Sequence, residues 1–440
     1  MDADELSHVT DWTGPDDELA AGALAGVKVV EFAQNMAIPS CGRILAAMGA
    51  DVVKVEPPRG DASRSMAPFP GISDGRGYAL TNPGKRSVVL DLTNPASDSV
   101  RDALVASADV ILCAFKGKDL VRYGLTYEHA VSLNPEVIYL EHRAFGSKGP
   151  EADEGGYDVL VQGLSGLSFV TSRSEGGRPL TVRPAYSDMS TGLASVAAVL
   201  AALYHRAQTG RGQRVRTSLL GTAHWLALPM NGRFDAHDRE QLDSFHDDLE
   251  IMRSAGLSFD DQRALFESRV LPAGGAFDIC FRHYQTSDSM LSVGALSPML
   301  IDRFYAVTGL PDARKQRWAY RGDEWQSFVA QAEALLVSDT TENWISRFRS
   351  GGVPCGPYYA PTEAINDPGA LANGFLVDLD HPTLGTYRTA AAPIEMDRSP
   401  VRTDRPSPAL GAHTDEVMRQ LGLDDATIAS LHVAGVIDPP

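Results

Sequence analysis

The chain has 440 residues, of which 43% are hydrophobic and 22% are charged, and its net charge is -18 at pH 7. Such a length can bury the cores of two or three domains. The acidic balance, with no block of lysine or arginine, predicts that neither nucleic acid nor an anionic membrane is a general partner. An anionic ligand would therefore need a local cluster of basic residues.

The cysteines and the amino-terminal segment both favour a cytoplasmic protein. Cys41, Cys113, Cys280 and Cys355 are widely spaced and form no CxxC pair, which argues against a disulfide framework and a thiolate metal site. Residues 1–24 are acidic where a signal peptide would be basic, and we interpret them as a loosely docked tail. No apolar run approaches the ~20 residues of a membrane span.

From residue 27 onward, short β-branched segments alternate with helical ones. The segments VKVVEF, DVVKVE, SVVLDL, DVILCAF and VIYLEH are separated by stretches such as CGRILAAMGA. This alternation predicts βαβ units on a parallel sheet that helices cover on both faces. Met189–Ala207 is then predicted as a helix, because its apolar residues recur every 3.6 positions until TGRG ends it, and Asp188 is expected to cap its start.

The character of the chain changes after Pro229, where a polar, charge-rich and helical stretch begins. We predict a large domain that starts with 25–228, a smaller α+β domain at 229–350, and a linker with a return to the large domain at 351–440. HYQTSDSMLSVGA predicts a hairpin in the small domain, while FLVDLDH and TYRTAAAPIEM predict two strands near the carboxyl end.

The best-known ligand motifs of parallel sheets are missing. The turn after the first strand reads FAQNMAIPSCG, without the GxGxxG that lets a backbone approach a pyrophosphate, so a dinucleotide-binding dehydrogenase is not favoured. There is no Walker A sequence, and the 11 histidines show neither HExxH nor HxxxH spacing. We therefore expect neither P-loop chemistry nor a metal site.

Six stretches follow one another in a characteristic order along most of the chain. They include VVEFAQNMAIPSCGRILAAMGADVVKVEPPRGD, NPGKRSVVLDL, ADVILCAFKGKDLVRYG, FGSKGPEADEGGYDVLVQGLSGL, RPAYSDMSTGLASVAAVL and PALGAHTDEVMRQLGL. As a set they resemble the family III CoA-transferases, which include formyl-CoA transferase and carnitine CoA-transferase. The resemblance implies an α/β fold with a Rossmann-like large domain built from both chain ends, a smaller α+β domain, and an interlocked homodimer. It also implies coenzyme A as substrate and carrier, and no metal.

The resemblance places the family's nucleophilic aspartate at Asp188, at the head of the helix that ends in TGRGQ. A carboxylate can attack a thioester carbonyl to give a mixed anhydride and CoA thiolate; the thiolate can then return, leaving an aspartyl-CoA thioester and a free acid. An incoming carboxylic acid reverses these steps and leaves as its CoA ester. Helix amides are expected to keep Asp188 ionised. Without the resemblance, helix capping alone would be the favoured role of this residue.

Tyr157 bears on the choice between CoA transfer and racemisation. The related α-methylacyl-CoA racemases carry a histidine before an aspartate as one half of an acid/base pair, whereas this chain reads GGYD. A racemase or CoA-ester isomerase is kept as the alternative function, beside a catalytically silent subunit that only binds CoA esters. Two roles stay open for Tyr157: lining the CoA or acyl site, or being a buried aromatic residue with a satisfied hydroxyl.

Binding of CoA phosphates by an acidic protein requires local cations. We predict such cations, with neighbouring polar and aromatic contacts, at loops beside the ends of the expected strands: Arg59, Asn82, Lys85, Arg86, Phe115, Lys116, Arg122 and Tyr157. By resemblance, Phe115 and the residues after it pack along the pantetheine and the nucleotide. The alternative for each single cation is a solvated surface position.

Departures from formyl-CoA transferase leave the acid substrate open. A glutamine, an asparagine and an arginine of that enzyme align with Met36, Ala114 and Pro57, and its tetraglycine loop has at best a shortened counterpart at 272–277. Formate and oxalate are therefore poorly supported as acceptors.

The strand that ends in VIYLEHRAFG is unusual for the family, because charged residues occupy a place that small or hydroxyl residues often fill. We hypothesise that His142 or Arg143 faces the acyl pocket and recognises a polar or anionic acid. The alternative is a buried salt bridge.

Overall fold

A computed structural model describes residues 21–72, 74–270, 279–312, 314 and 323–438. Most of the expected amino-terminal tail and the glycine-loop counterpart at 272–277 lie outside the described residues. The described chain divides into two compact units.

Both ends of the chain contribute to the first unit. It comprises the described residues up to Ser172, Thr181–Asn231 and the described residues from Ala370 onward. The second unit comprises Arg173–Leu180 and Gly232–Gly369.

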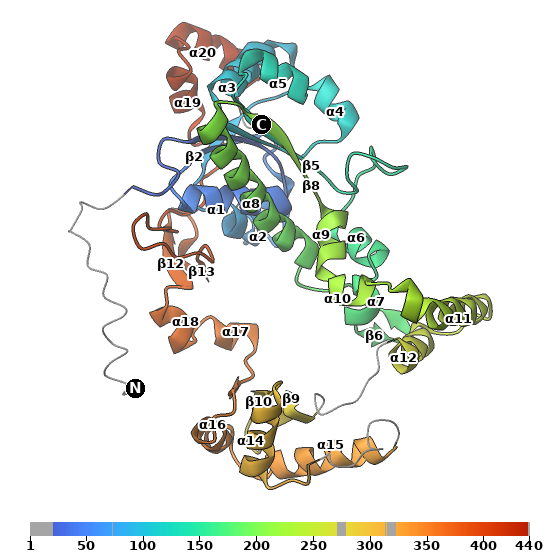
Figure 1. Cartoon of the computed structure of the whole chain (residues 1–440). Coiled ribbons are helices and arrows are strands. Elements are labelled where there is room, and N and C mark those ends of the chain that lie inside the picture. The colour runs from blue at the N-terminus through green and yellow to red at the C-terminus, as the bar shows by residue number, and fades with distance from the viewer. Residues whose placement is uncertain (1–20, 73, 271–278, 313, 315–322, 439–440) are drawn as a thin grey trace. The chain divides into compact units, whose positions relative to one another are not determined.

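A six-stranded parallel sheet forms the centre of the first unit (Figure 1). Its spatial order is β3–β2–β1–β4–β5–β8. The strands are β1 (Lys28–Phe32), β2 (Asp51–Glu56), β3 (Arg86–Val89), β4 (Val110–Cys113), β5 (Ile138–Arg143) and β8 (Gln213–Ser218). The parallel sheet predicted from the β-branched segments is confirmed for β1 to β5, while β8 was not predicted. The chain order reverses between β1 and β4, which makes this the topological switch point of the sheet.

Successive side chains of each strand face different helical layers. One face packs against α1 (Ala37–Ala47) and α8 (Tyr186–Thr209), with Val29 and Val52 among its core residues. The other face packs against α3 (Asp98–Ser107), α5 (Tyr127–Leu133), α19 (Thr414–Gln420) and α20 (Asp425–Val433), with Val30 and Val53 in its core. Because neighbouring residues of a strand point to opposite faces, burial on both faces requires nearly continuous apolar strands.

The predicted helix at Met189–Ala207 is confirmed and extends further at both ends, as α8. Among the described residues, it is the one helix that is long and apolar enough to cross a membrane by length and composition, which corrects the expectation that no apolar run approaches this length. Its Val199 and Ala202 side chains are buried in the core of the first unit. Here α8 serves as a core helix of the α/β layer.

The remaining elements of the first unit are short. They are α2 (Arg76–Thr81), α4 (Gly117–Arg122), α6 (Asp158–Leu164), α7 (Leu167–Thr171), α9 (Leu219–Leu226), α10 (Leu228–Asn231), and the antiparallel pair β12 (Leu376–His381) and β13 (Gly385–Ala390). The β12–β13 pair confirms the two strands predicted near the carboxyl end.

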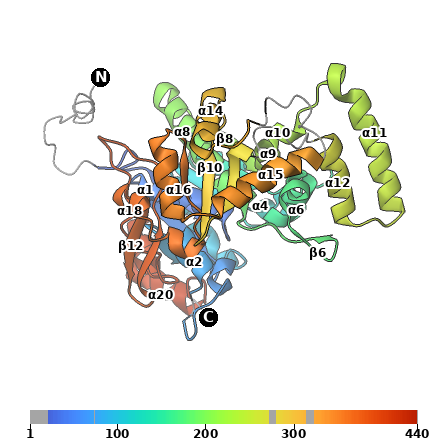
Figure 2. The same ribbon diagram turned by 90° about the horizontal axis from the view of Figure 1, so that it is seen from below.

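A three-stranded antiparallel sheet with helices packed on it forms one core of the second unit. The strands are β9 (Phe281–Gln285), β10 (Met290–Gly294) and β11 (Cys355–Pro357), and the helices are α14 (Pro298–Thr308), α15 (Asp323–Leu336) and α16 (Thr341–Ser350). The β9–β10 pair confirms the predicted hairpin. The same unit contains the β6–β7 hairpin (Ser174–Glu175 and Arg178–Pro179) and two helices, α11 (Asp235–Ser254) and α12 (Phe259–Arg269), which lie side by side (Figures 1 and 2). The domain boundaries expected at 229 and 350 stay predictions.

Candidate functional site

A cavity of about 350 Å³ opens beyond the carboxyl ends of β1, β4 and β5. Its wall contains residues 34–38 after β1, residues 114–116 after β4, and residues 142–144 at the end of β5. Residues 152 and 154–157, Asp188 and Leu219 complete the lining. The cavity therefore lies at the switch point between β1 and β4, where open α/β sheets bind ligands.

The cavity brings together a part of the predicted site residues. Met36, Phe115, Lys116, His142, Arg143, Tyr157 and Asp188 line it. Arg59, Asn82, Lys85, Arg86 and Arg122 do not, and among them Arg59 and Arg122 are exposed. The roles of all these residues in binding CoA or the acid stay predictions.

Lys85 precedes β3 and Arg86 is its first residue, whereas the cavity lies where the strands end. The Arg86 Nε donates to Asp51 Oδ1 at 2.9 Å, and its Nη1 lies 3.0 Å from Glu416 Oε1. The Lys85 Nζ is buried and lies 2.8 Å from Glu31 Oε2. Burial lowers the pKa of Lys85 to about 8, although the Glu31 carboxylate opposes this shift. Both cations thus form ion pairs within the protein itself.

A buried group of charges supports the loop that follows β1. The Lys54 Nζ lies 2.9 Å from Glu31 Oε1 and 2.7 Å from Asp61 Oδ2, and it donates to the Ala33 carbonyl oxygen at 2.7 Å. The Asp61 Oδ1 accepts a hydrogen bond from the Asn35 backbone N–H at 3.0 Å. Asn35 has φ +67°, a left-handed conformation that is uncommon outside glycine. Lys54 and Asp61 therefore hold the cavity-lining loop before and at its left-handed residue.

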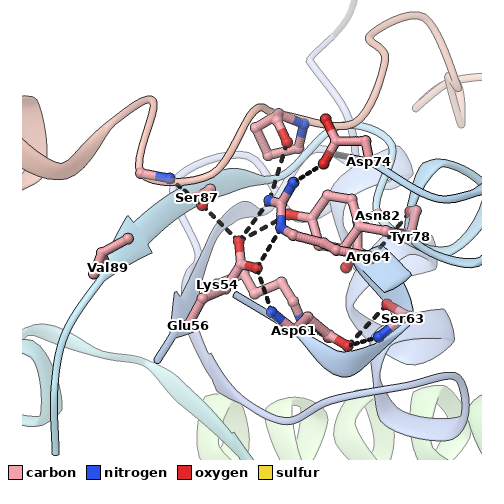
Figure 3. Close-up of polar contacts among 12 residues, drawn as sticks. Lys54, Glu56, Asp61, Ser63, Arg64, Asp74, Tyr78, Asn82, Ser87 and Val89 are labelled. Carbon is pink, nitrogen blue, oxygen red and sulfur yellow. Dashed lines mark hydrogen bonds and ion pairs between the residues drawn. The ribbon is translucent and has the colours of Figure 1, made fainter. Parts of the chain in front are cut away.

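Glu56 extends this buried group from the end of β2 (Figure 3). Its carboxylate accepts hydrogen bonds from Arg64 Nε at 2.8 Å, the Tyr78 hydroxyl at 3.0 Å and the Ser87 hydroxyl at 2.6 Å. It also accepts from the Asp61 backbone N–H at 2.9 Å. Burial alone would raise the pKa of Glu56, but the hydrogen bonds and charge of Arg64 hold it below its usual value. Glu56 thus holds Asp61 in place, and Asp61 in turn holds the loop that follows β1.

Asp188 lies within the first turn of α8, and α8 begins three residues earlier than predicted, at Tyr186. Asp158 Oδ1, on α6, accepts hydrogen bonds from the backbone N–H groups of Ser187 at 2.8 Å and Asp188 at 3.3 Å. Within the described residues, the Asp188 side chain makes no capping hydrogen bond of its own. The prediction that Asp188 caps the helix is therefore wrong, because Asp158 caps it instead.

The ionisation of Asp188 also differs from the prediction. Burial, and then the neighbouring Asp158 carboxylate, raise the pKa of Asp188 to about 7. The helix amides were expected to stabilise the ionised form, but Asp158 occupies them and adds a second negative charge. Near pH 7 the Asp188 carboxyl group is therefore divided between its protonated and ionised forms.

His142 and Arg143 both line the cavity, with different charge states. Burial lowers the pKa of His142 to about 4, so that its imidazole is neutral at pH 7 and offers hydrogen bonds only. Its Nδ1 lies 3.2 Å from Thr217 Oγ1. Arg143 Nη2 lies 2.8 Å from Glu141 Oε1, and Nη1 lies 3.4 Å from Asp153 Oδ1. The salt bridge that was the alternative for Arg143 is present.

Three further residues give the cavity its mixed surface. Tyr157 is 66% exposed, so the alternative of a buried aromatic residue is wrong. Lys116 is half-buried beside Gly155, where a Cβ atom would lie 2.9 Å from the Lys116 Nζ. Phe115 packs edge-to-face with Tyr123, with 5.3 Å between ring centroids. Glycine at 155 thus makes room for the lysine.

Asp158, Lys54 and Asp61 are the supporting residues that sequence reasoning missed. Asp158 directly follows Tyr157 in the GGYD motif, and this adjacency was its available signal. Lys54 lies within a strand that otherwise reads as buried, which is an unusual place for lysine.

Among the described residues, no group of three or more His, Cys, Asp or Glu side chains is placed to hold a metal ion.

Comparison with known proteins gives full-length relatives. The description of CoA-transferase family III matches residues 24–246 and 262–414. A succinate–glutarate CoA-transferase of Agrobacterium fabrum is 33% identical over 416 residues, which cover 90% of this chain and 95% of the relative. A formyl-CoA:oxalate CoA-transferase of Rhodopseudomonas palustris is 30% identical over 428 residues, or 95% of this chain and 98% of the relative.

Solved structures share the fold. A CAIB/BAIF family protein from Brucella suis superposes with a TM-score of 0.70 at 26% identity, covering 91% of this chain and 100% of that one. A hypothetical protein from Mycobacterium tuberculosis gives a TM-score of 0.70 at 24% identity over 90% of this chain and 99% of that one, a likeness in fold alone. With relatives that are named as transferases, the racemase alternative is not favoured. The chain belongs to family III of the CoA-transferases and is an enzyme of that class.

Proposed function

We propose that the enzyme moves CoA from an acyl-CoA thioester to a carboxylic acid, with Asp188 as the nucleophile. The observation that carries this proposal is one cavity in which Asp188 lies with Phe115, Lys116 and Tyr157, the segments that the family resemblance assigns to CoA. The position of this cavity at the switch point of the sheet supports it.

The proposed reaction balances without a metal or an external energy source. Asp188 Oδ attacks the thioester carbonyl carbon, the C–S bond breaks, and CoA leaves as a thiolate, so that a mixed anhydride forms. The thiolate attacks the aspartyl carbonyl carbon of this anhydride and releases the donor acid as its carboxylate. The acceptor carboxylate then attacks the carbonyl carbon of the aspartyl-CoA thioester, the C–S bond breaks, and a second mixed anhydride forms as CoA thiolate leaves. The thiolate attacks the acceptor acyl carbon of this anhydride, which forms the new acyl-CoA and releases the Asp188 carboxylate.

The acid specificity belongs to the same cavity. We propose that Arg143, aided by hydrogen bonds from neutral His142, recognises a polar or anionic group of the acid. The Arg143 guanidinium lines the cavity while Glu141 fixes its orientation, which favours a planar, directional contact with a carboxylate. The names of the relatives suggest a panel of succinate, glutarate, oxalate and formate as acceptors.

Trapping of the covalent intermediate tests the nucleophile. The enzyme is mixed with a panel of acyl-CoA donors and then with hydroxylamine, and the tryptic peptide that contains Asp188 is weighed by mass spectrometry. We expect a CoA or hydroxamate adduct on this residue, and loss of turnover by roughly 10⁴-fold or more in Asp188→Ala. An adduct at another carboxylate, or full turnover in Asp188→Ala, would exclude the proposal.

We also propose that the enzyme acts as a homodimer with interlocked subunits, as the family resemblance implies. Large apolar side chains of α8 and α9, including Leu193, Tyr204 and Trp225, are exposed in the single chain, which supports a protein partner at these helices. Light scattering after size-exclusion chromatography would contradict this if it found a monomer under native conditions.

A further inference from the structure

We propose that Asp158 is a positioning residue that occupies the amino-terminal amides of α8, denies them to Asp188, and thereby keeps the Asp188 carboxylate basic and reactive. The inference rests on the proposed role of Asp188 as nucleophile. It adds a residue that contacts the helix end and acts through it.

Asp158 is held in this position by contacts at both of its carboxylate oxygens. Oδ1 accepts from the Ser187 and Asp188 backbone N–H groups at 2.8 and 3.3 Å. Oδ2 accepts a hydrogen bond from the Gln162 side-chain amide, one turn later on α6. Both Asp158 and Gln162 are buried. The carboxylate therefore cannot rotate away from the helix end without leaving buried donors unsatisfied.

The end of a helix normally stabilises an anion, because several N–H groups point outward without partners. An aspartate in the first turn would receive this stabilisation and become a weak base. In this chain Asp158 takes the hydrogen bonds, and its charge opposes ionisation of Asp188. Burial acts in the same direction and is the larger cause.

Other charged or titratable groups face the cavity from the neighbouring elements. They are Tyr157 and Glu154 before α6, Lys116 after β4, and His142 and Arg143 on β5. His142 is neutral at pH 7 and Arg143 is paired with Glu141. The residues of the α1 segment that line the cavity, Met36 to Ile38, carry no charge. Asp158 is distinguished from all of these by its direct hydrogen bonds to the first turn of α8.

This arrangement affects the proposed chemistry through the charge that Asp188 loses. When Asp188 is acylated or carries CoA, its negative charge disappears, and with it the repulsion from Asp158 and the cost of a buried anion. The ground state of the free carboxylate is thus raised relative to the covalent intermediates. A carboxylate without stabilising hydrogen bonds is also the stronger nucleophile.

Three variants separate the charge of Asp158 from its capping role. Asp158→Asn and Asp158→Ser each offer an uncharged oxygen to the Ser187 and Asp188 backbone N–H groups, whereas Asp158→Glu keeps the negative charge. Carboxyl-¹³C aspartate labelling, with Asp188→Asn to assign the signal, gives the pKa of Asp188 by NMR independently of turnover. Glu154→Gln is the control, because it removes a charge from the cavity wall without touching the helix end.

We expect the two neutral variants to lower the pKa of Asp188 by roughly one unit, since the Asp158 charge is the second of the two causes that raise it, after burial. The pH profile of adduct formation should move by the same amount in these two variants, while Asp158→Glu and Glu154→Gln leave the pKa of Asp188 near its wild-type value. An unchanged pKa in a folded neutral variant overturns the inference, and so does a failure of both neutral variants to fold when Asp158→Glu folds. If the pKa moves but no adduct forms in wild type, the proposed function fails and the coupling stands.

Discussion

Two groups of buried or half-buried charges lie in the first unit, and they differ in how the charges are balanced. Around Lys54 each charge has a partner of opposite sign, because the ammonium group contacts both Glu31 and Asp61. At the start of α8, Asp158 and Asp188 are two like charges, and within the described residues neither carboxylate has a salt bridge. Opposite charges hold the cavity loop in one geometry, while like charges keep a carboxylate reactive. A buried charge can thus serve either shape or chemistry, depending on its neighbour.

The largest effect on this comparison is expected from Lys54→Met, which breaks the balanced group. The substitution leaves Glu31 and Asp61 buried without their shared cation, and such a loss costs about 3–5 kcal/mol in the free energy of unfolding. Urea denaturation measures it. Arg419→Met is the matched control, since its pairs with Asp415 and Asp425 are exposed and should contribute about 1 kcal/mol or less. Equal losses in both variants would show that the buried pairing has no special weight.

Asp188→Asn removes one of the two like charges at the start of α8 and should make the protein more stable than wild type at high pH. The folded pKa of Asp188, about 7, lies above its unfolded value near 3.8, so the native state holds this proton more tightly than the unfolded state. Wild type therefore loses free energy of unfolding relative to Asp188→Asn as the pH rises from about 4 to about 7. At pH 8 we expect this loss to be roughly 2–4 kcal/mol. Melting curves at pH 4 and pH 8 measure this difference. A gap that does not grow with pH would contradict the shifted pKa.

Gly192→Ala disturbs the packing that sets α8 beside α1 and the supported loop. The added Cβ would lie 2.9 Å from Ser40 Cβ and 3.0 Å from the Ala37 carbonyl oxygen, so we expect a loss of about 1–3 kcal/mol and weaker adduct formation. Gly163→Ala on α6 is the control, because its Cβ meets no atom within 4 Å. That change should be neutral or stabilising by up to about 1 kcal/mol. Similar losses at the two sites would indicate a general intolerance of side chains.

The smallest effect is expected from Arg143→Met. Arg143 is paired with Glu141, as the buried charges around Lys54 are paired, but it also lines the cavity. Loss of a directional contact with the acid should reduce kcat/KM for dicarboxylic acceptors about 5- to 10-fold relative to monocarboxylic ones, or about 1 kcal/mol. Arg216→Met is the control, because Arg216 also pairs with Glu141, at 3.3 Å, but does not line the cavity. If both variants changed the preference for dicarboxylic acceptors equally, the loss would have to be attributed to Glu141 and not to a contact of Arg143 with the acid.

The parallel sheet and the position of α8 could be predicted from the sequence, because apolar periodicity indicates which segments are strands and helices. The placement of Asp188 in a site came from the family resemblance, since the residue by itself reads as a helix cap. The supporting contacts could not be predicted in this way. Asp158 and Ser187 are 29 residues apart, and Lys54 reaches Ala33, which directly follows the neighbouring strand β1. Such pairs depend on how the helices and strands pack against one another, and this packing cannot be predicted from the local sequence around either residue.

The cation assignments show the same limit. Lys85 and Arg86 are adjacent in a basic motif, yet one is buried against Glu31 and the other pairs with Asp51. A rule based on composition treats both as available to a phosphate. Their position at the beginning of β3, which is the end of the strand that does not face the cavity, is the signal that would have separated Arg86 from the site.

The construction of the first unit from both ends of the chain has a consequence for protein synthesis. Val417, Met418, Ile428 and Leu431 belong to the same core as Val30 on β1. While the ribosome makes the chain, the part of this face that α19 and α20 cover stays exposed until those helices, which begin at Thr414 and Asp425, have emerged. Until then the nascent polypeptide presents an uncovered apolar patch, which is the situation in which chaperones bind.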